Sequence, residues 1–160
     1  MGKISPIGTL ALGGLALSLI VLAGLGFWWF QAAPAVVLTP DDPAVVSRGE
    51  SLYVQHCASC HGVDLSGEPD WRTRKPSGRL PAPPHDVSGH TWHHPDQQLF
   101  RITKLGVGEV AGLDDYQSDM PAYAGILSDA EILAVLSYIK STWPEEIRRR
   151  HDALNRQAGG

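Results

Sequence analysis

Residues 49–62 read G-E-S-L-Y-V-Q-H-C-A-S-C-H-G. Both cysteines of the 160-residue chain lie in this stretch, as Cys57 and Cys60, and His61 follows the second one directly. Two thiols separated by two residues can each add to one vinyl group of a haem, while the next side chain is carried under the iron. This is the spacing of c-type haem attachment. We therefore predict one covalently attached haem c, bound by Cys57 and Cys60, with His61 as an axial ligand of its iron.

The same residues admit three other interpretations. A thioredoxin-like redox pair requires a β–α–β setting, and the chain shows no convincing strand alternation. A tetrahedral structural zinc site requires two more ligands at finger-like spacing. A structural disulfide accounts for both cysteines but leaves His61 as a coincidence. Haem attachment accounts for Cys57, Cys60 and His61 together.

The sixth coordination position of a haem iron takes a second side chain or stays open. Apart from the initiator, Met120 is the sole methionine, and it lies in S-D-M-P-A-Y at 118–123. This stretch is polar and stiffened by Pro121, whereas a methionine that fills a core gap belongs on an apolar helical face. Histidine/methionine ligation saturates the iron and raises its reduction potential. We predict Met120 as the second axial ligand, with core filling as the alternative.

Two helices are expected before the Met120 stretch. Asp42 is an N-cap residue followed by proline at the first helical position, which predicts a helix over about 43–56. A second helix opens at Pro95 and Asp96, and Gly106 closes it.

Two more helices are expected after that stretch. Ser128 and Glu131 form an S-x-x-E capping box before an apolar stripe, and Pro144 ends this helix. Glutamates 145–146 followed by arginines 148–150 suit the dipole of a short terminal helix. We interpret this last helix as solvated, with a docking surface as the alternative.

The chain from about Pro43 to Trp143 resembles class I cytochrome c. The matching stretches are residues 49–62, M-P-A-Y at 120–123 and L-S-D-A-E-I-L-A-V-L-S-Y-I-K at 127–140, in the family's order. The resemblance implies an all-α domain of three to five helices around the haem. It also implies that the helix before the haem motif crosses the C-terminal core helix at Gly49, with Tyr53 and Tyr138 packed around the crossing.

The resemblance further implies that a backbone carbonyl of a proline-rich segment accepts a hydrogen bond from the imidazole of His61. The available segment is L-P-A-P-P at 80–84. A histidine that ligates a metal through one ring nitrogen commonly donates the N–H of its other ring nitrogen in this way. The sequence does not choose the carbonyl.

The middle of the chain, from Gly67 to Gly108, departs from the simple family pattern. It holds a basic cluster, which we interpret as a solvated loop or as a surface that steers an acidic redox partner. It then holds three histidines and a tryptophan, which suggest contacts with the haem propionates or, less simply, a second metal site. The cluster comprises Arg72, Arg74, Lys75 and Arg79, and the second group comprises His90, Trp92, His93 and His94. No role is assigned to His56 or His151.

The N-terminal part of the chain is apolar. The 24 residues from Ile7 to Phe30 contain only Thr9 and Ser18 as polar breaks, which is long enough to cross a bilayer. Four aromatic residues at 27–30 are typical of a membrane interface. We predict a membrane anchor over 1–30 with a transmembrane helix at about 7–30. A cleaved signal sequence, with Ala33-Pro34-Ala35 at the cleavage site, is the alternative.

These segments give the expected organisation: the anchor at 1–30, a proline-rich linker at 31–42, the cytochrome c domain at 43–143 and a tail helix at 144–160. Lys3 is the one basic residue before Asp41. Positive charge stays on the cytoplasmic side, so we expect a single-pass protein of the bacterial inner membrane with its haem domain on the periplasmic side.

Charge excludes one class of partner. From Asp41 onward the chain carries 12 of its 13 basic residues and all 17 acidic ones, so nucleic acid is not expected to bind.

We predict an electron carrier rather than an enzyme. Its expected donor is a quinol-oxidising complex, and its expected acceptor is a terminal oxidase or a periplasmic reductase. The alternatives are a fixed cytochrome subunit of a larger membrane oxidoreductase and a ligand-binding or peroxidatic haem protein.

Overall fold

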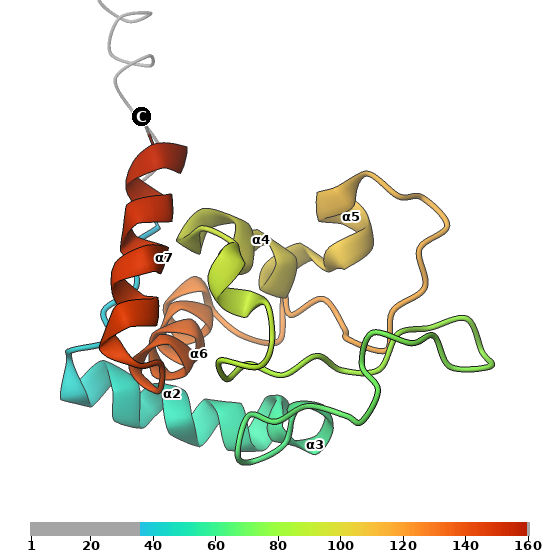
Figure 1. The fold of residues 1–160 in the computed structure, drawn as a ribbon, viewed down its shortest axis with the longest axis horizontal. Helices are drawn as coiled ribbons and strands as arrows, with labels where there is room; N and C mark the ends of the chain where they lie inside the picture. The colour runs from blue at the N-terminus through green and yellow to red at the C-terminus, as the bar shows by residue number, and fades with distance from the viewer. Residues whose placement is uncertain (1–35, 160) are drawn as a thin grey trace, which may run out of the picture. The chain divides into compact units, whose positions relative to one another are not determined.

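The computed structural model describes residues 36–159, and within that range the chain is helical with no β-strand (Figure 1). This agrees with the predicted all-α class. Five α-helices lie between Pro43 and Ser141, and a sixth follows them. The elements are α2 (Pro43–His56), α3 (Ala58–His61), the 3₁₀ turn η1 (Thr91–His93), α4 (Asp96–Leu105), α5 (Val107–Ala111), α6 (Asp129–Ser141) and α7 (Glu145–Ala158).

Helix α2 begins and ends where the sequence predicts. The Oδ1 atom of Asp42 accepts hydrogen bonds from the backbone N–H groups of Ala44 (2.9 Å) and Val45 (3.2 Å). Pro43 occupies the first helical position, where no N–H partner is needed. The helix therefore fixes the position of Cys57, its C-cap residue.

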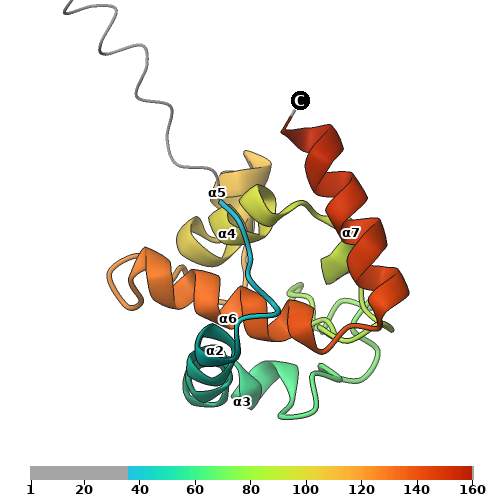
Figure 2. The same ribbon diagram turned by 90° about the vertical axis from the view of Figure 1, so that its left-hand side faces the viewer.

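Helices α2 and α6 cross steeply, as the two views at right angles show (Figures 1 and 2). The crossing lies at Gly49, where an added Cβ atom would stand 2.0 Å from the carbonyl oxygen of Ala134 and 2.9 Å from Cβ of Tyr138. Only glycine lets the two backbones come this close. The rings of Tyr53 and Tyr138 pack beside it with centroids 5.5 Å apart, so the predicted crossing is confirmed.

Helix α6 forms the centre of the hydrophobic core. Its predicted capping box is present, since the Ser128 hydroxyl accepts from the Glu131 backbone N–H and the Glu131 carboxylate accepts from the Ser128 backbone N–H. The buried apolar residues of the helix are Ile132, Ala134, Val135, Leu136 and Ile139. They pack with core residues from the other helices, among them Leu52, Tyr53, Leu99, Phe100 and Trp143.

Helix α4 confirms the helix expected from Pro95 to Gly106. Three short elements, α3, η1 and α5, were not predicted. They span four, three and five residues, which is too short to show a hydrophobic period.

Helix α7 corrects the prediction of a short, solvated terminal helix. It runs for 14 residues, and His151 on its inner face is fully buried. The imidazole of His151 lies 2.8 Å from the carbonyl oxygen of His94. The helix therefore packs against the haem-motif domain through one face and exposes the other.

The last residues of the predicted linker also belong to the folded unit. The backbone N–H of Leu38 donates to the carboxylate of Asp96 (3.1 Å), and that of Thr39 donates to the hydroxyl of Ser137 (3.0 Å). Leu38 itself is buried in the core. The folded part thus begins several residues before Pro43.

Residues 36–159 contain no helix that is both long and apolar enough to cross a membrane. The predicted transmembrane helix at 7–30 lies outside the described residues.

Candidate haem site

His61 is buried, and a hydrogen bond to the backbone orients its imidazole. It ends helix α3 and is 5% exposed. Its Nδ1 atom lies 2.9 Å from the carbonyl oxygen of Pro83. A carbonyl only accepts, so Nδ1 carries the proton and Nε2 keeps its lone pair. Burial lowers the pKa of His61, which favours this neutral form. Among the carbonyls of segment 80–84, the structure selects that of Pro83.

The Pro83 segment is fixed by close backbone packing against Gly67. Gly67 has a left-handed backbone with φ +69°, and an added Cβ atom would lie 2.6 Å from the Pro84 nitrogen and 2.7 Å from the Ala82 oxygen. The Gly67 N–H donates to the carbonyl of His61 over 2.8 Å. The same glycine therefore contacts both partners of the hydrogen bond that orients the imidazole.

His85 belongs to the site, although nothing in the sequence distinguished it. Its ring lies against that of His61. Its Nδ1 atom is 2.8 Å from the hydroxyl of Thr91, and its carbonyl oxygen accepts from the indole N–H of Trp143 (2.8 Å). Burial lowers the pKa of His85 well below its ordinary value, so it is neutral. It follows two prolines in a segment without helical or strand period, and sequence reasoning had no signal for it.

Cys57 lies at the junction of α2 and α3, Cys60 lies within α3, and no disulfide joins the two residues. Cys57 is partly buried, and burial raises its pKa to about 11. Cys60 is exposed. The C-A-S-C-H motif is therefore presented on helical backbone, with the thiol-bearing residues and His61 within one short helix and its N-cap.

Met120 lies in the loop before α6, partly buried and packed against the core. Three residues later, the hydroxyl of Tyr123 donates to the carbonyl of His56 over 2.6 Å. His56 directly precedes Cys57, so this bond ties the M-P-A-Y segment to the haem motif although 67 residues separate the two partners. The structure thus brings the predicted sixth ligand and the attachment motif into one region.

The donor set of this region fits a haem. Two free thiols, an imidazole with an available Nε2 atom and a thioether are the groups that a His/Met-ligated haem c takes. The indole N–H of Trp92 is buried without a hydrogen-bond partner among the described residues. A buried N–H normally has an acceptor, and a haem propionate is an acceptor of the right kind.

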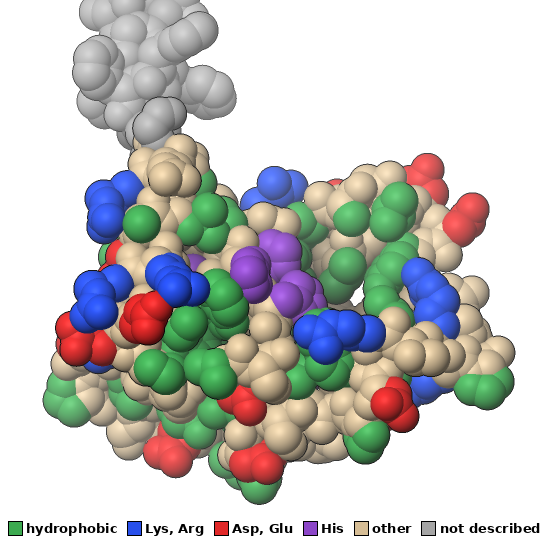
Figure 3. Space-filling view, viewed as in Figure 1, with side chains coloured by type: hydrophobic (Ala, Val, Ile, Leu, Met, Phe, Trp, Pro, Cys, Tyr) green, Lys and Arg blue, Asp and Glu red, His purple; other side chains and the backbone are tan. Residues whose placement is uncertain are grey.

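The surface histidines of the middle region lie just before α4. Figure 3 shows histidine side chains together at the middle of one face of the domain. His90 stacks on the ring of Trp71 with centroids 5.2 Å apart, and His94 lies edge-on to His90. Among residues 36–159, no group of three or more histidine, cysteine or acidic side chains is arranged to bind a metal ion. These histidines make aromatic contacts instead.

The basic cluster lies in an irregular surface loop, where two of its four side chains form ion pairs. Lys75 pairs with Glu68 (3.0 Å), and Arg79 pairs with Asp119 (2.5 Å). Arg72 lies 4.0 Å over the ring of Trp71. Arg72 and Arg74 are exposed, and Lys75 and Arg79 stay partly exposed while paired. The cluster is therefore a solvated loop, as predicted, in which two of the cations are paired within the molecule.

Comparison with known proteins agrees with this chemistry. The family model described as Cytochrome c matches residues 46–143, which contain C-A-S-C-H and Met120. A curated relative, the Cbb3-type cytochrome c oxidase subunit FixPc of Rhizobium leguminosarum bv. viciae, is 25% identical over 103 residues. The match covers 64% of this chain and 30% of the relative, so the chain spans less than a third of that protein. No solved structure matches.

Proposed function

This chain belongs to the cytochrome c family, and on that premise we propose that it transfers single electrons through one haem c whose iron is ligated by His61 and Met120. Family membership implies covalently bound haem c and a role in electron transfer. The observation that carries the ligand assignment is the bond from the imidazole of His61 to the Pro83 carbonyl. It leaves one ring nitrogen of a buried, neutral histidine available directly after the second cysteine.

Each residue of the site has a separate task. Cys57 and Cys60 attach the group through thioether bonds. His61 presents Nε2 while Pro83 holds its other nitrogen. Met120 provides the sixth ligand from a partly buried position. When bound, the haem supplies an iron that alternates between ferrous and ferric states. With His61 and Met120 both bound to the iron, no coordination position would be left for a substrate, which would favour electron transfer.

The proposed setting is the periplasmic face of the bacterial inner membrane. The support is the apolar run at 7–30 together with Lys3 on its N-terminal side. We propose that the domain receives electrons from a quinol-oxidising complex and passes them to a terminal oxidase or a periplasmic reductase. Extraction from membranes by detergent but not by high salt is the expected result, and release by salt alone would contradict the anchor.

A second candidate function is a fixed cytochrome subunit of a larger membrane oxidoreductase. It is supported by the relative whose name describes a subunit of a cbb3-type oxidase. Mild detergent extraction followed by size-exclusion chromatography separates the two proposals. A carrier elutes alone, whereas a subunit elutes with stoichiometric partner chains.

Optical spectra of the haem-loaded protein test the ligand assignment. We expect the wild type to show the weak far-red band of iron–methionine ligation when oxidised and to leave carbon monoxide unbound when reduced. Met120→Ala is expected to lose the band and bind carbon monoxide. Ile126→Ala, a change at an exposed residue six positions away in the same loop, is expected to behave like the wild type. A high-spin wild type that binds carbon monoxide would contradict the carrier and favour a ligand-binding protein.

A further inference from the structure

The loop from Gly67 to Ala82 is closed at its base and folded back on itself. The Glu68 backbone N–H donates to the Ala82 carbonyl (2.9 Å), and the Ala82 N–H donates to the Glu68 carboxylate (2.6 Å). The Lys75 ammonium reaches the same carboxylate at 3.0 and 3.1 Å. Ala82 precedes Pro83, so this loop ends beside the residue whose carbonyl orients His61.

The far end of this loop meets the loop that carries Met120. Arg79 donates from Nη1 to the Asp119 carboxylate at 2.5 Å, and Lys75 Nζ lies 3.6 Å from the other oxygen of Asp119. Asp119 is the residue directly before Met120. The backbone N–H of Met120 is itself held by the hydroxyl of Ser118 at 3.0 Å.

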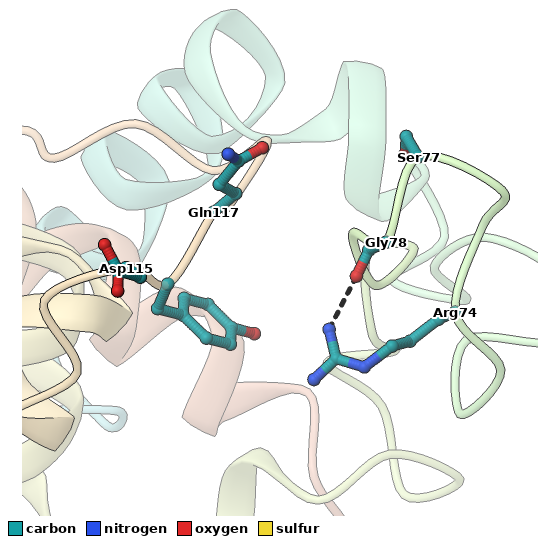
Figure 4. Close-up of a pocket in the computed structure, with 6 residues that line it drawn as sticks. Arg74, Ser77, Gly78, Asp115 and Gln117 are labelled. Carbon is teal, nitrogen blue, oxygen red and sulfur yellow. Dashed lines mark hydrogen bonds between the residues drawn. The ribbon is translucent and has the colours of Figure 1, made fainter.

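The two loops also face each other away from these ion pairs. Both lie on the side of the domain opposite α7 (Figure 1). A recess of about 340 Å³ lies between them, lined by Arg74 and Gly78 on one side and by Asp115 and Gln117 on the other (Figure 4). The Arg74 guanidinium donates a hydrogen bond to the carbonyl of Gly78 (2.6 Å). This bond lies within the 67–82 loop and does not join it to the Met120 loop. The direct bridges between the loops are those to Asp119.

We propose that Arg79 and Lys75 are positioning residues that hold the Met120 loop in its ligating position through Asp119. This rests on the proposed ligation by Met120. It gives the basic cluster a task inside the molecule, since these two cations are paired with Asp119 and Glu68. Opening of the Met120 loop requires the bridge to Asp119 to break, and closing restores it.

The strength of such a bridge is modest. The side chains of Arg79 and Asp119 are each about two-fifths exposed, and exposed ion pairs change an equilibrium by roughly two- to fivefold. Salt screens them further. The bridge therefore makes a small change in the fraction of molecules in which Met120 is not bound to the iron. The core contacts of Met120 and the hydrogen bond from Tyr123 to the His56 carbonyl contribute more to that equilibrium.

The test is competition for the sixth position by added imidazole. The oxidised, haem-loaded full chain is titrated with imidazole at pH 8, and loss of the far-red band gives its affinity. Arg79→Gln and Asp119→Asn are each expected to raise the apparent affinity about two- to fivefold. The double variant is expected to add little to Asp119→Asn, because Asp119→Asn already removes the pairings of Asp119 with both Arg79 and Lys75. Raising the salt concentration is expected to increase the affinity of the wild type more than that of Asp119→Asn.

Arg72→Gln is the matched control. It removes one positive charge from the same loop, but Arg72 lies over Trp71 and not on Asp119. We expect it to bind imidazole as the wild type does. An equal effect of Arg72→Gln and Arg79→Gln would overturn the proposal, as would additive effects of Arg79→Gln and Asp119→Asn. A wild type without the far-red band would overturn the ligation by Met120 as well, so the two failures are distinguishable.

Discussion

The imidazole of His85 stacks on the imidazole of His61, with ring centroids 4.1 Å apart and ring planes inclined by 22°. His61 is thereby restrained twice: Pro83 fixes its Nδ1 atom, and His85 covers one face of the ring. His85 is held in turn by Thr91 and by the indole of Trp143. The rotation of the His61 ring is therefore set by Pro83 and His85, which are not among the proposed iron ligands.

Replacing His85 tests this restraint. In His85→Ala, the free face of His61 is expected to let the ring rotate. The electron paramagnetic resonance spectrum of the oxidised protein should then change while the far-red band of methionine ligation remains. We also expect a loss of about 1–3 kcal/mol in the free energy of unfolding, because a packed side chain is removed. His85→Phe keeps a flat ring and is expected to retain the wild-type spectrum. Equal spectral changes in both variants would show that the stack does not orient His61.

Gly49→Ala tests the helix crossing. The added methyl group would lie 2.0 Å from the Ala134 carbonyl oxygen, so α2 and α6 must separate. Overpacking of this kind costs roughly 1–3 kcal/mol or more, and we expect at least about 2 kcal/mol in urea denaturation of the haem-loaded protein. Gly112→Ala is the control. Gly112 has φ +65° but no atom within 4 Å of an added Cβ, so only the backbone strain of about 1 kcal/mol is expected. Equal losses would contradict close packing at the crossing.

The long helices could be predicted because their signals are local. Asp42 with Pro43 and Ser128 with Glu131 mark helix starts within four residues, and the structure confirms both caps. The haem motif is local as well, since five consecutive residues carry it. Patterns that lie within a few consecutive residues are the ones that can be recognised most reliably from a single sequence.

The remaining parts of the site depend on contacts between distant residues. Arg79 and Asp119 are 40 residues apart, and the partner of His61 is 22 residues away at Pro83. The resemblance to the family limited the hydrogen-bond partner of His61 to segment 80–84. The choice of the Pro83 carbonyl depends on the backbone path that packing against Gly67 fixes. His85 lies beside its partner only because that path turns back on α3. No periodicity in the sequence encodes these juxtapositions.

The C-terminal helix introduces a buried polar group that should make stability depend on pH. His151 on α7 is fully buried, with Nε2 2.8 Å from the carbonyl of His94 and 3.6 Å from Asp96. Its Nδ1 atom is buried without a partner among the described residues. Lys140 and Asp152 lie in the same cluster, joined at 2.6 Å. Burial is the main reason that the pKa of His151 is lowered, and the nearby Lys140 adds to it.

The sign of the effect follows from where the proton binds. In the unfolded chain His151 binds a proton near its ordinary pKa of about 6.5. In the folded chain its pKa is lower, so His151 binds the proton only at a lower pH. The unfolded state thus binds more protons as the pH falls below about 6.5, and the free energy of unfolding decreases until the lowered folded-state pKa is reached. Urea denaturation of the haem-loaded protein between pH 8 and pH 5 measures this. His151→Gln, which keeps a donor for the His94 carbonyl but does not titrate, is expected to lose part of the pH dependence. His151→Phe should lose the same part and be less stable at every pH, because the His94 carbonyl is left without its donor. A pH dependence in His151→Gln as steep as in the wild type would show that His151 is not the group responsible.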